Sequence, residues 1–256
     1  MGLGIDKKGQ FIVIAAMLMS IMIISISAII YSSVTYFKAE RWEEYVILVD
    51  SVKTGTTRVV EISLANYTQT LNTTILRDNM DKWSPDVKQA YPGFGVTLTY
   101  NLSNALTQAY GVSINYALGL ARTWYQTTSF SAGNTTVSLS LASVGLTGYS
   151  FSSSAFLKET ILDATYTAKT KMLTIYLSIE REDLIPITNL KKDSFSLRVD
   201  GVSKDFSVSR YYSSTYSRFI YEIRRENEPS LPFVVSVTAT ETRGIRVIAN
   251  STVMQV

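Results

Sequence analysis

Three acidic side chains lie close together in the chain, where Glu180, Glu182 and Asp183 follow an alternating apolar segment. Two such carboxylates could hold a cation or act as an acid and base pair in hydrolysis. The chain has no His and no Cys, which excludes histidine triads, thiol catalysis and cysteine-ligated zinc. A charged turn explains the three acids equally well, so we predict no enzyme activity, no metal and no cofactor.

Two other pairs of charged residues are weaker candidates for ligand binding. Asp200 and Asp205 flank a predicted hairpin and could bind calcium weakly, although the Asp-Gly turn already accounts for Asp200. Arg224 and Arg225 could contact a phosphate or an acidic glycan, but glutamates beside them favour a mixed, solvated patch. No Gly-rich phosphate loop is present.

Tyrosine is abundant, with 16 residues in the chain. Tyr211, Tyr212, Tyr216 and Tyr221 lie close in sequence, and tyrosine is favoured at binding surfaces. Strands also favour tyrosine. Surface glycans are therefore a candidate ligand class, and an ordinary strand is the alternative.

The overall charge balance excludes several classes of protein. With 24 Lys and Arg against 21 Asp and Glu, the net charge of +3 does not fit a strongly basic nucleic-acid-binding protein. Hydrophobic residues make up 46% of the chain, too many for a disordered protein. We therefore expect a folded chain that has no nucleic-acid partner.

The N-terminal region contains an uncharged apolar run from Phe11 to Ile30. A helix of that length spans about 30 Å, which matches the hydrocarbon core of a bilayer. The alternative, a cleaved secretory signal, usually has a shorter apolar region of about 7–15 residues. Lys7 and Lys8 precede the run, so the positive-inside rule predicts a cytoplasmic N-terminus and residues 38–256 outside. We predict a single-pass protein of the cell membrane.

N-x-S/T sequons occur only on the predicted outer side of the membrane. Such sites are candidates for N-glycosylation in an exported protein, although a chain rich in Ser and Thr contains several by chance. The candidate acceptors are Asn66, Asn72, Asn101, Asn134 and Asn250.

The segment from Asp6 to Phe11 (DKKGQF), followed at once by the apolar run, resembles the class III leader of archaeal type IV pilin-like proteins. The resemblance covers about 30 residues of the N-terminal segment only. It implies that Lys7 and Lys8 are the basic leader residues and that a prepilin peptidase cuts after Gly9. Gln10 would then begin the mature chain, and its hydrophobic helix would serve as membrane anchor and as the core of a filament of like subunits.

One position departs from the family pattern. Many pilins carry Glu at the fifth mature position, and this chain has Ile14 there. The departure does not oppose cleavage, but it weakens the expectation of polymerisation. A plain signal anchor that reads KKGQ by chance remains the alternative.

The predicted organisation is α+β and membrane-anchored, in five parts. These are a leader (1–9), a transmembrane helix (10–37), an extracytoplasmic stalk helix (38–88), a low-charge β-rich region (89–157) and an immunoglobulin-like β-sandwich (158–256). Gly55 is a weak point where the stalk is expected to kink or break. Pro85 is expected to end the stalk, and Pro92-Gly93 to make a turn.

The β regions are predicted from period-two alternation. Region 89–157 carries Arg122 as its only charge, which favours association with other subunits, glycans or a surface layer. Residues 104–125 fit a helix or a strand equally well. Alternation at 173–179, 195–199, 202–208, 219–223, 233–240 and 245–249, with a first strand near 160–168, suggests about seven strands. The last two flank the turn Thr242-Arg243-Gly244 and are expected to form a hairpin.

Together these features favour a non-enzymatic cell-surface protein that is pilin-like or pseudopilin-like and acts by assembly or attachment. The alternative is a membrane-anchored extracellular module that binds glycan or peptide ligands.

Overall fold

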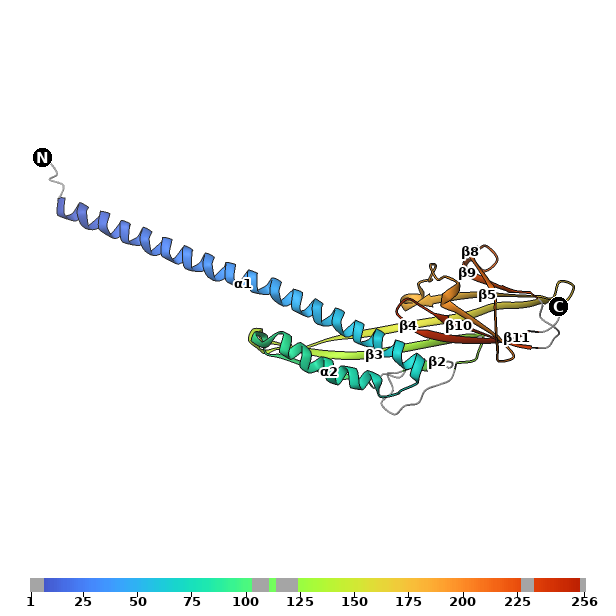
Figure 1. Cartoon of the computed structure of the whole chain (residues 1–256). Helices are drawn as coiled ribbons and strands as arrows, with labels where there is room; N and C mark the ends of the chain where they lie inside the picture. The colour runs from blue at the N-terminus through green and yellow to red at the C-terminus, as the bar shows by residue number, and fades with distance from the viewer. Residues whose placement is uncertain (1–6, 103–110, 114–123, 227–232, 254–256) are drawn as a thin grey trace. The chain divides into compact units, whose positions relative to one another are not determined.

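The structure, a computed structural model, describes residues 7–102, 111–113, 124–226 and 233–253 (Figure 1). The chain forms two compact units, residues 1–52 and 53–256, with the boundary inside the long helix α1 (Lys7–Thr70). Below, the first unit is called the anchor unit and the second the β unit. Of the predicted leader at 1–9, residues 1–6 lie outside the described residues.

In the anchor unit, α1 is a continuous helix because no Gly or Pro interrupts residues 10–54. Its large apolar side chains from Met17 to Ile30 are all more than half exposed, between 53% and 68%. Ser20 Oγ donates a hydrogen bond to the Ala16 carbonyl at 2.9 Å, which satisfies its hydroxyl within the helix.

In the β unit, α1 continues without a break through Gly55 to Thr70, so the predicted kink at Gly55 is wrong. The reason for the glycine is tertiary. A Cβ at residue 55 would lie 2.3 Å from Cζ2 of Trp83, which belongs to the second helix, α2 (Ile75–Ala90). The indole Nε1 of Trp83 donates to Thr56 Oγ1 at 3.2 Å. Gly55 therefore permits close packing of α2 on α1.

The helical stalk is interrupted at residues 71–74 and not near Pro85. Within this break, Leu71 takes a left-handed backbone conformation (φ 56°). Pro85 lies inside α2, so the prediction that it ends the helix is wrong. The adjacent Ser84 Oγ donates to the Leu98 carbonyl at 3.1 Å, which ties this turn of α2 to the neighbouring strand. Tertiary contacts thus maintain the helix past a residue that locally disfavours it. As predicted, Pro92 begins a turn, η1 (Pro92–Phe94).

The larger sheet of the β unit has seven strands among the described residues, in the order β1-β3-β4-β5-β9-β8 with β2 beside β3. Among the described residues, the β2–β3 pair is parallel and the other neighbouring strands of this sheet pair antiparallel. The bounds are β1 (Val96–Asn101), β2 (Gly111–Ser113), β3 (Thr128–Leu141), β4 (Leu146–Thr167), β5 (Met172–Arg181), β8 (Ser207–Ser213) and β9 (Arg218–Arg225). Of residues 104–125, those at 111–113 form a strand and 124–125 lie outside regular elements, whereas 104–110 and 114–123 lie outside the described residues.

The smaller sheet has the order β11-β10-β6-β7, with all its pairs antiparallel. Its strands are β6 (Phe195–Val199), β7 (Val202–Lys204), β10 (Phe233–Thr240) and β11 (Arg246–Val253). The predicted strands at 195–199 and 233–240 are confirmed, as is the hairpin that joins 233–240 to 245–249. The single strand predicted at 202–208 is wrong. It divides into β7 and β8, which belong to different sheets.

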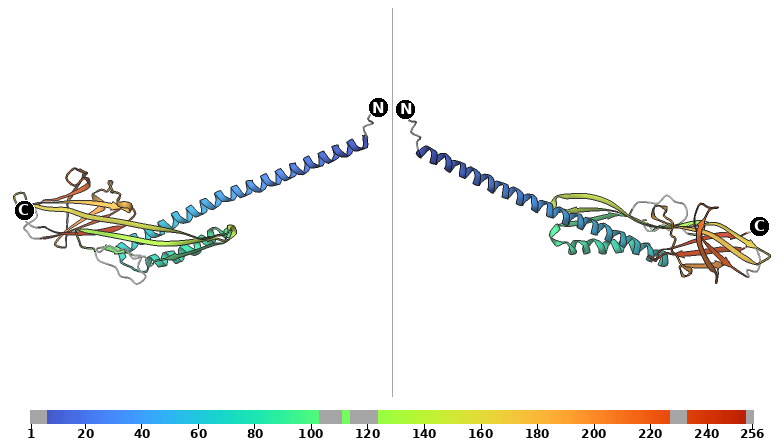
Figure 2. Two further views of the ribbon diagram at one scale, coloured as in Figure 1. Left: turned by 180° about the vertical axis from the view of Figure 1, so that it is seen from behind. Right: turned by 90° about the horizontal axis from the view of Figure 1, so that it is seen from above.

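Strands β3 and β4 form a long antiparallel hairpin in the β unit, whose paired residues run from Thr128 with Thr160 to Leu141 with Leu146. Strand β4 runs unbroken through residues 157 and 158, where the sequence predicted a domain boundary. Near its 128–160 end, the hairpin is packed against β11. Helix α2 is packed against β1, the strand that lies beside β3 in the sheet. In the views of Figure 2, α2 stays alongside the hairpin. The larger sheet therefore contributes to both a sheet-on-sheet core, through the hairpin, and a helix-on-sheet core, through β1.

Candidate functional site

The anchor unit contains one candidate membrane-spanning segment among the described residues, Ala15–Val34, with none of its residues buried. Length and apolar composition allow either a membrane anchor or a signal sequence. Lys7, Lys8, Gly9 and Gln10 form the first residues of α1, followed by Phe11. At the far end of the predicted span, Ile30 is 58% exposed. An apolar surface of this kind requires lipid or protein to cover it.

The five sequons differ in their accessibility. Asn66, Asn72 and Asn101 are exposed, whereas Asn134 in β3 and Asn250 in β11 are half-buried. The Oδ1 atoms of Asn134 and Asn250 are buried and have no hydrogen-bond partner among the described residues.

Asn72 lies in the loop between α1 and α2. Its Oδ1 accepts hydrogen bonds from both the backbone N–H and Oγ1 of Thr74, each at 3.1 Å. This loop leaves the Asn72 amide nitrogen and the Thr74 hydroxyl of the same sequon on one exposed turn. Of the five sequons, Asn72 is therefore the one best presented for modification.

The acidic residues that the sequence singled out do not converge. Glu180 pairs with Lys158 at 3.0 Å and with Arg218 at 3.7 Å. Glu182 instead accepts a hydrogen bond from the Phe156 backbone N–H at 2.8 Å, and Asp183 is exposed. Among the described residues, no group of three His, Cys, Asp or Glu side chains could hold a metal ion.

The two aspartates of the β6–β7 region also serve separate structural roles. Asp200 Oδ1 accepts from the Val234 backbone N–H at 2.9 Å. Asp205 pairs with Lys192 at 2.8 Å, and this cation lowers the pKa of the Asp205 carboxyl below its ordinary value. Arg224 pairs with Glu222, and Arg225 donates to the Asp205 carbonyl at 3.1 Å. Neither arginine stands as a free anion-binding group.

The four tyrosines do not form one surface. Tyr221 is fully buried, and its hydroxyl accepts from the Leu190 N–H at 3.0 Å and donates to the Ile187 carbonyl at 2.9 Å. Burial raises the pKa of that hydroxyl. Tyr211 and Tyr212 are exposed but alternate along β8, so they lie on opposite faces of the sheet. Tyr216 instead packs near Tyr176, with ring centroids 6.0 Å apart.

An arginine cluster, formed by Arg243 with Glu61, Glu182 and Glu241, is the main charged feature that sequence reasoning missed. The guanidinium of Arg243 lies 3.0 Å from Glu61, 2.6 Å from Glu182 and 2.6 Å from Glu241. These acids come from α1, from the turn η3 (Glu182–Leu184) and from the turn between β10 and β11, respectively. No short motif could have revealed a pairing between residues 182 positions apart.

Burial and neighbouring charges together shift the pKa values of residues in the arginine cluster. Burial alone would lower the pKa of Arg243, but its three carboxylates raise it above the ordinary value. Burial raises the pKa of Glu241 despite the attraction of Arg243. The cluster ties α1 to both sheets, because it joins residue 61 to the η3 turn and to the β10–β11 turn.

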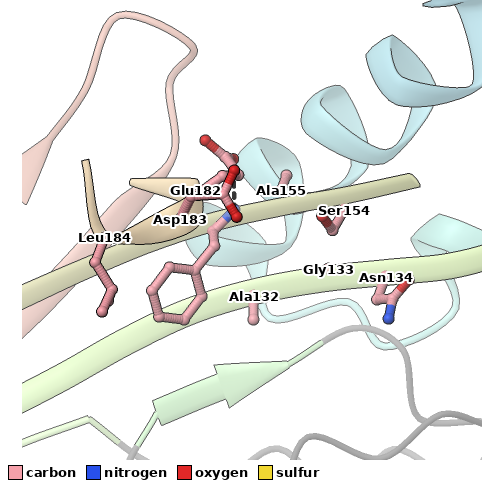
Figure 3. A pocket seen from close by; sticks show the side chains of 9 residues that line it. Ala132, Gly133, Asn134, Ser154, Ala155, Glu182, Asp183 and Leu184 are labelled. Carbon is pink, nitrogen blue, oxygen red and sulfur yellow. Dashed lines mark hydrogen bonds between the residues drawn. The ribbon is translucent and has the colours of Figure 1, made fainter. Parts of the chain in front are cut away.

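A cavity of about 350 Å³ opens between β3, β4 and η3 (Figure 3). We call it the β3–β4 cavity. Small residues form much of its lining, namely Ala132, Gly133, Ser154 and Ala155, together with Asn134, Phe156, Glu182, Asp183 and Leu184. Apart from the two acids, no local pattern indicated this cavity, because its residues come from three segments that only the sheet register brings together.

Comparison of the chain with protein-family models, curated proteins and solved structures returned no significant match.

Proposed function

We propose that this protein is a membrane-anchored, outward-facing surface protein of the type IV pilin-like or pseudopilin-like kind. The observation that carries the proposal is the basic segment Lys7-Lys8-Gly9-Gln10 leading directly into an uncharged helix with exposed apolar side chains. Lysines hold a leader at the cytoplasmic face. A glycine before the cut lets a peptidase approach the peptide bond closely. The β unit would then lie outside the cell.

An uncharged helix supports assembly as well as anchoring. Many copies can pack side by side without burying charge, which would be unfavourable without a partner. Ile14 occupies the position where many pilins carry Glu. We therefore favour a minor or pseudopilin-like subunit that acts by assembly or attachment, with no reaction of its own.

The first test is the mass of the N-terminal peptide of protein purified from its native membranes. A chain that begins at Gln10 supports prepilin-type processing, and a chain that retains residues 1–9 overturns it in favour of a plain anchor. Gly9→Val should block processing because it places a branched side chain at the cut. Gly4→Val, elsewhere in the leader, should be processed normally.

A second test addresses assembly through the helix. Met19 is 65% exposed in the middle of the apolar segment. Met19→Asp should abolish assembly, because the carboxylate would be buried without a partner. Met19→Leu should preserve assembly. Normal filaments from the Asp variant would refute a filament role for this helix.

We also propose that strands β4–β11 form an immunoglobulin-like sandwich. The support is the strand order. Labelled A, B, C, C′, D, E, F and G along the chain, these strands give A-B-E-D in one sheet and G-F-C-C′ in the other. Immunoglobulin domains place A, B, E and D in one sheet and C, F and G in the other. The buried B–F disulfide of antibody domains has no counterpart, because the chain lacks Cys.

The sheet order can be tested by cross-linking in this cysteine-free chain. Arg198 in β6 and Asn250 in β11 both pair with Ser236 of the intervening β10. The double variant R198C/S236C should form a disulfide. R198C/N250C should not, because its cysteines lie two strands apart. The reverse result would overturn the assigned order.

A second candidate function is a membrane-anchored binding module. The specific observation that favours it is the β3–β4 cavity, which is open at the surface of the β unit and carries acidic side chains.

A further inference from the structure

We propose that the β3–β4 cavity binds a basic side chain, an arginine guanidinium in particular, presented by a protein partner. This inference deepens the second candidate function and requires neither leader processing nor filament assembly.

The shape of the cavity suits a long, unbranched side chain. Ala132, Gly133 and Ala155 add little or no side-chain bulk to the two strands, which leaves a hollow along the hairpin (Figure 3). Phe156 borders this hollow, and its ring is stacked on Phe130 with centroids 5.9 Å apart. A methylene stem can lie against such an apolar lining, while an aromatic ring also attracts a cation.

Three side chains of the lining carry carboxylate or amide oxygens that accept hydrogen bonds, namely Asn134, Glu182 and Asp183. The Oδ1 of Asn134 is buried and has no hydrogen-bond partner among the described residues. Asp183 is exposed, and its carboxylate has no ion-pair partner in the described part of the chain. Glu182 adds a second carboxylate at the same edge, although its Oε1 already accepts from the Phe156 N–H and from Arg243. An incoming group should therefore bring several donors and a positive charge, which describes a guanidinium.

The protein supplies no cation of its own to this lining within the described residues. Arg243 is engaged by Glu61, Glu182 and Glu241 and does not line the cavity. The four carboxylates of Glu61, Glu182, Glu241 and Asp183 outnumber the two guanidiniums of Arg243 and of Arg181, which precedes Glu182 in the chain. The region thus carries an excess of negative charge that attracts a basic ligand.

The turn that presents the aspartate is strained. Asp183 and Leu184 both have φ of 58°, in the left-handed region that a bulky residue such as leucine rarely adopts. Leu184 is also 60% exposed. Strained backbone of this kind concentrates at ligand sites, and here it places a carboxylate and an apolar side chain together at the rim of a cavity.

Saturation-transfer NMR tests the proposal with the full chain in lipid nanodiscs. The probes are N-acetyl-arginine amide and N-acetyl-citrulline amide, which share shape but differ in charge. We expect saturation transfer to the arginine probe and at least a fivefold weaker signal for the citrulline probe. Asp183→Asn should lower affinity for the arginine probe at least fivefold. Asp193→Asn, at an exposed acid of the turn η4 (Lys192–Ser194), should leave it unchanged.

Further outcomes separate this proposal from its competitors. Ser154→Phe, at an exposed lining position, should block the arginine probe by filling the cavity. Equal signals for arginine and citrulline, or full binding by the Asp183→Asn variant with an unchanged circular dichroism spectrum, would overturn the proposal. Saturation transfer to N-acetylglucosamine but not to the arginine probe would instead identify a glycan site. None of these outcomes depends on the N-terminal peptide mass.

Discussion

Glu159 offers the sharpest test of the β unit's core, because it is a carboxylic acid placed where no water reaches it. The residue is 0% exposed, and neither carboxylate oxygen meets hydrogen-bond geometry with a partner among the described residues. On β4 it pairs with Ser129 of β3 and Ile179 of β5. Burial raises its pKa well above the ordinary value of 4.5, and the Ala249 amide offsets this only in part. Glu159 should therefore stay protonated in the folded protein at pH values where the unfolded chain has lost the proton.

The difference between the folded and unfolded pKa values of Glu159 makes the stability of the protein depend on pH. Below the unfolded pKa, Glu159 is protonated in both states and adds no pH dependence. Above it, the unfolded state binds fewer protons than the folded state, so stability falls as pH rises until the folded pKa is reached. The slope is about 1.4 kcal/mol per pH unit, or about 3 kcal/mol over two units within that window.

Glu159→Gln removes the ionisation and keeps nearly the same shape. We expect the variant to match the parent chain near pH 4 and to become steadily more stable than it as the pH rises toward 7. Guanidinium unfolding of the full chain in detergent, followed by tryptophan fluorescence at each pH, measures this. Trp83 and Trp124 both lie in the β unit.

Glu226→Gln is the matched control, because Glu226 is exposed just after β9. Its stability curve should run parallel to that of the parent chain. If the Glu159→Gln curve also runs parallel, with a gap that does not grow with pH, then Glu159 is hydrated or paired in solution and our reading of the core is refuted.

Three further predictions concern packing, charge and modification. Gly55→Ala should destabilise the β unit by about 1–3 kcal/mol in denaturant unfolding, because the new methyl overlaps the Trp83 ring. Gly93→Ala is the control and should change stability little, because its methyl meets open space. A Gly55→Ala variant more stable than the parent chain would contradict this packing. Arg243→Leu should lower the melting temperature, because it leaves three carboxylates uncompensated at a cost of roughly 3 kcal/mol. Adding Glu61→Gln to this variant should recover part of the loss. An unchanged melting temperature for Arg243→Leu would show that the arginine cluster is solvated. In protein from native membranes, glycopeptide mass spectrometry should find sugar at Asn72 and none at Asn250, and the opposite occupancy would mean that the Asn72 loop is covered or that β11 opens.

Much of the fold follows from local patterns. The apolar run of α1 and the period-two strands such as β5 and β10 depend on residues a few positions apart, so they can be read along the chain. The Thr242-Arg243-Gly244 turn between β10 and β11 follows in the same way. The absence of His and Cys likewise removes whole classes of chemistry without any structure.

The errors share one physical cause. Propensity disfavours helix at Gly55 and Pro85, yet packing against Trp83 and the bond from Ser84 to Leu98 keep both residues helical. At such positions the tertiary contact outweighs a local cost of about 1–3 kcal/mol. The split of 202–208 into two sheets has the same character, because sheet membership is decided by partners far along the chain.

The sequence by itself determined the apolar N-terminal helix, the basic segment before it and the β character of the rest, since each depends on neighbouring residues alone. Only the tertiary structure decided that Arg243 meets Glu61 across 182 positions, that Glu159 is buried in the core, and that β3, β4 and η3 enclose a cavity. The reason is that burial and pairing depend on strand register and sheet stacking, which bring together residues that no local pattern relates.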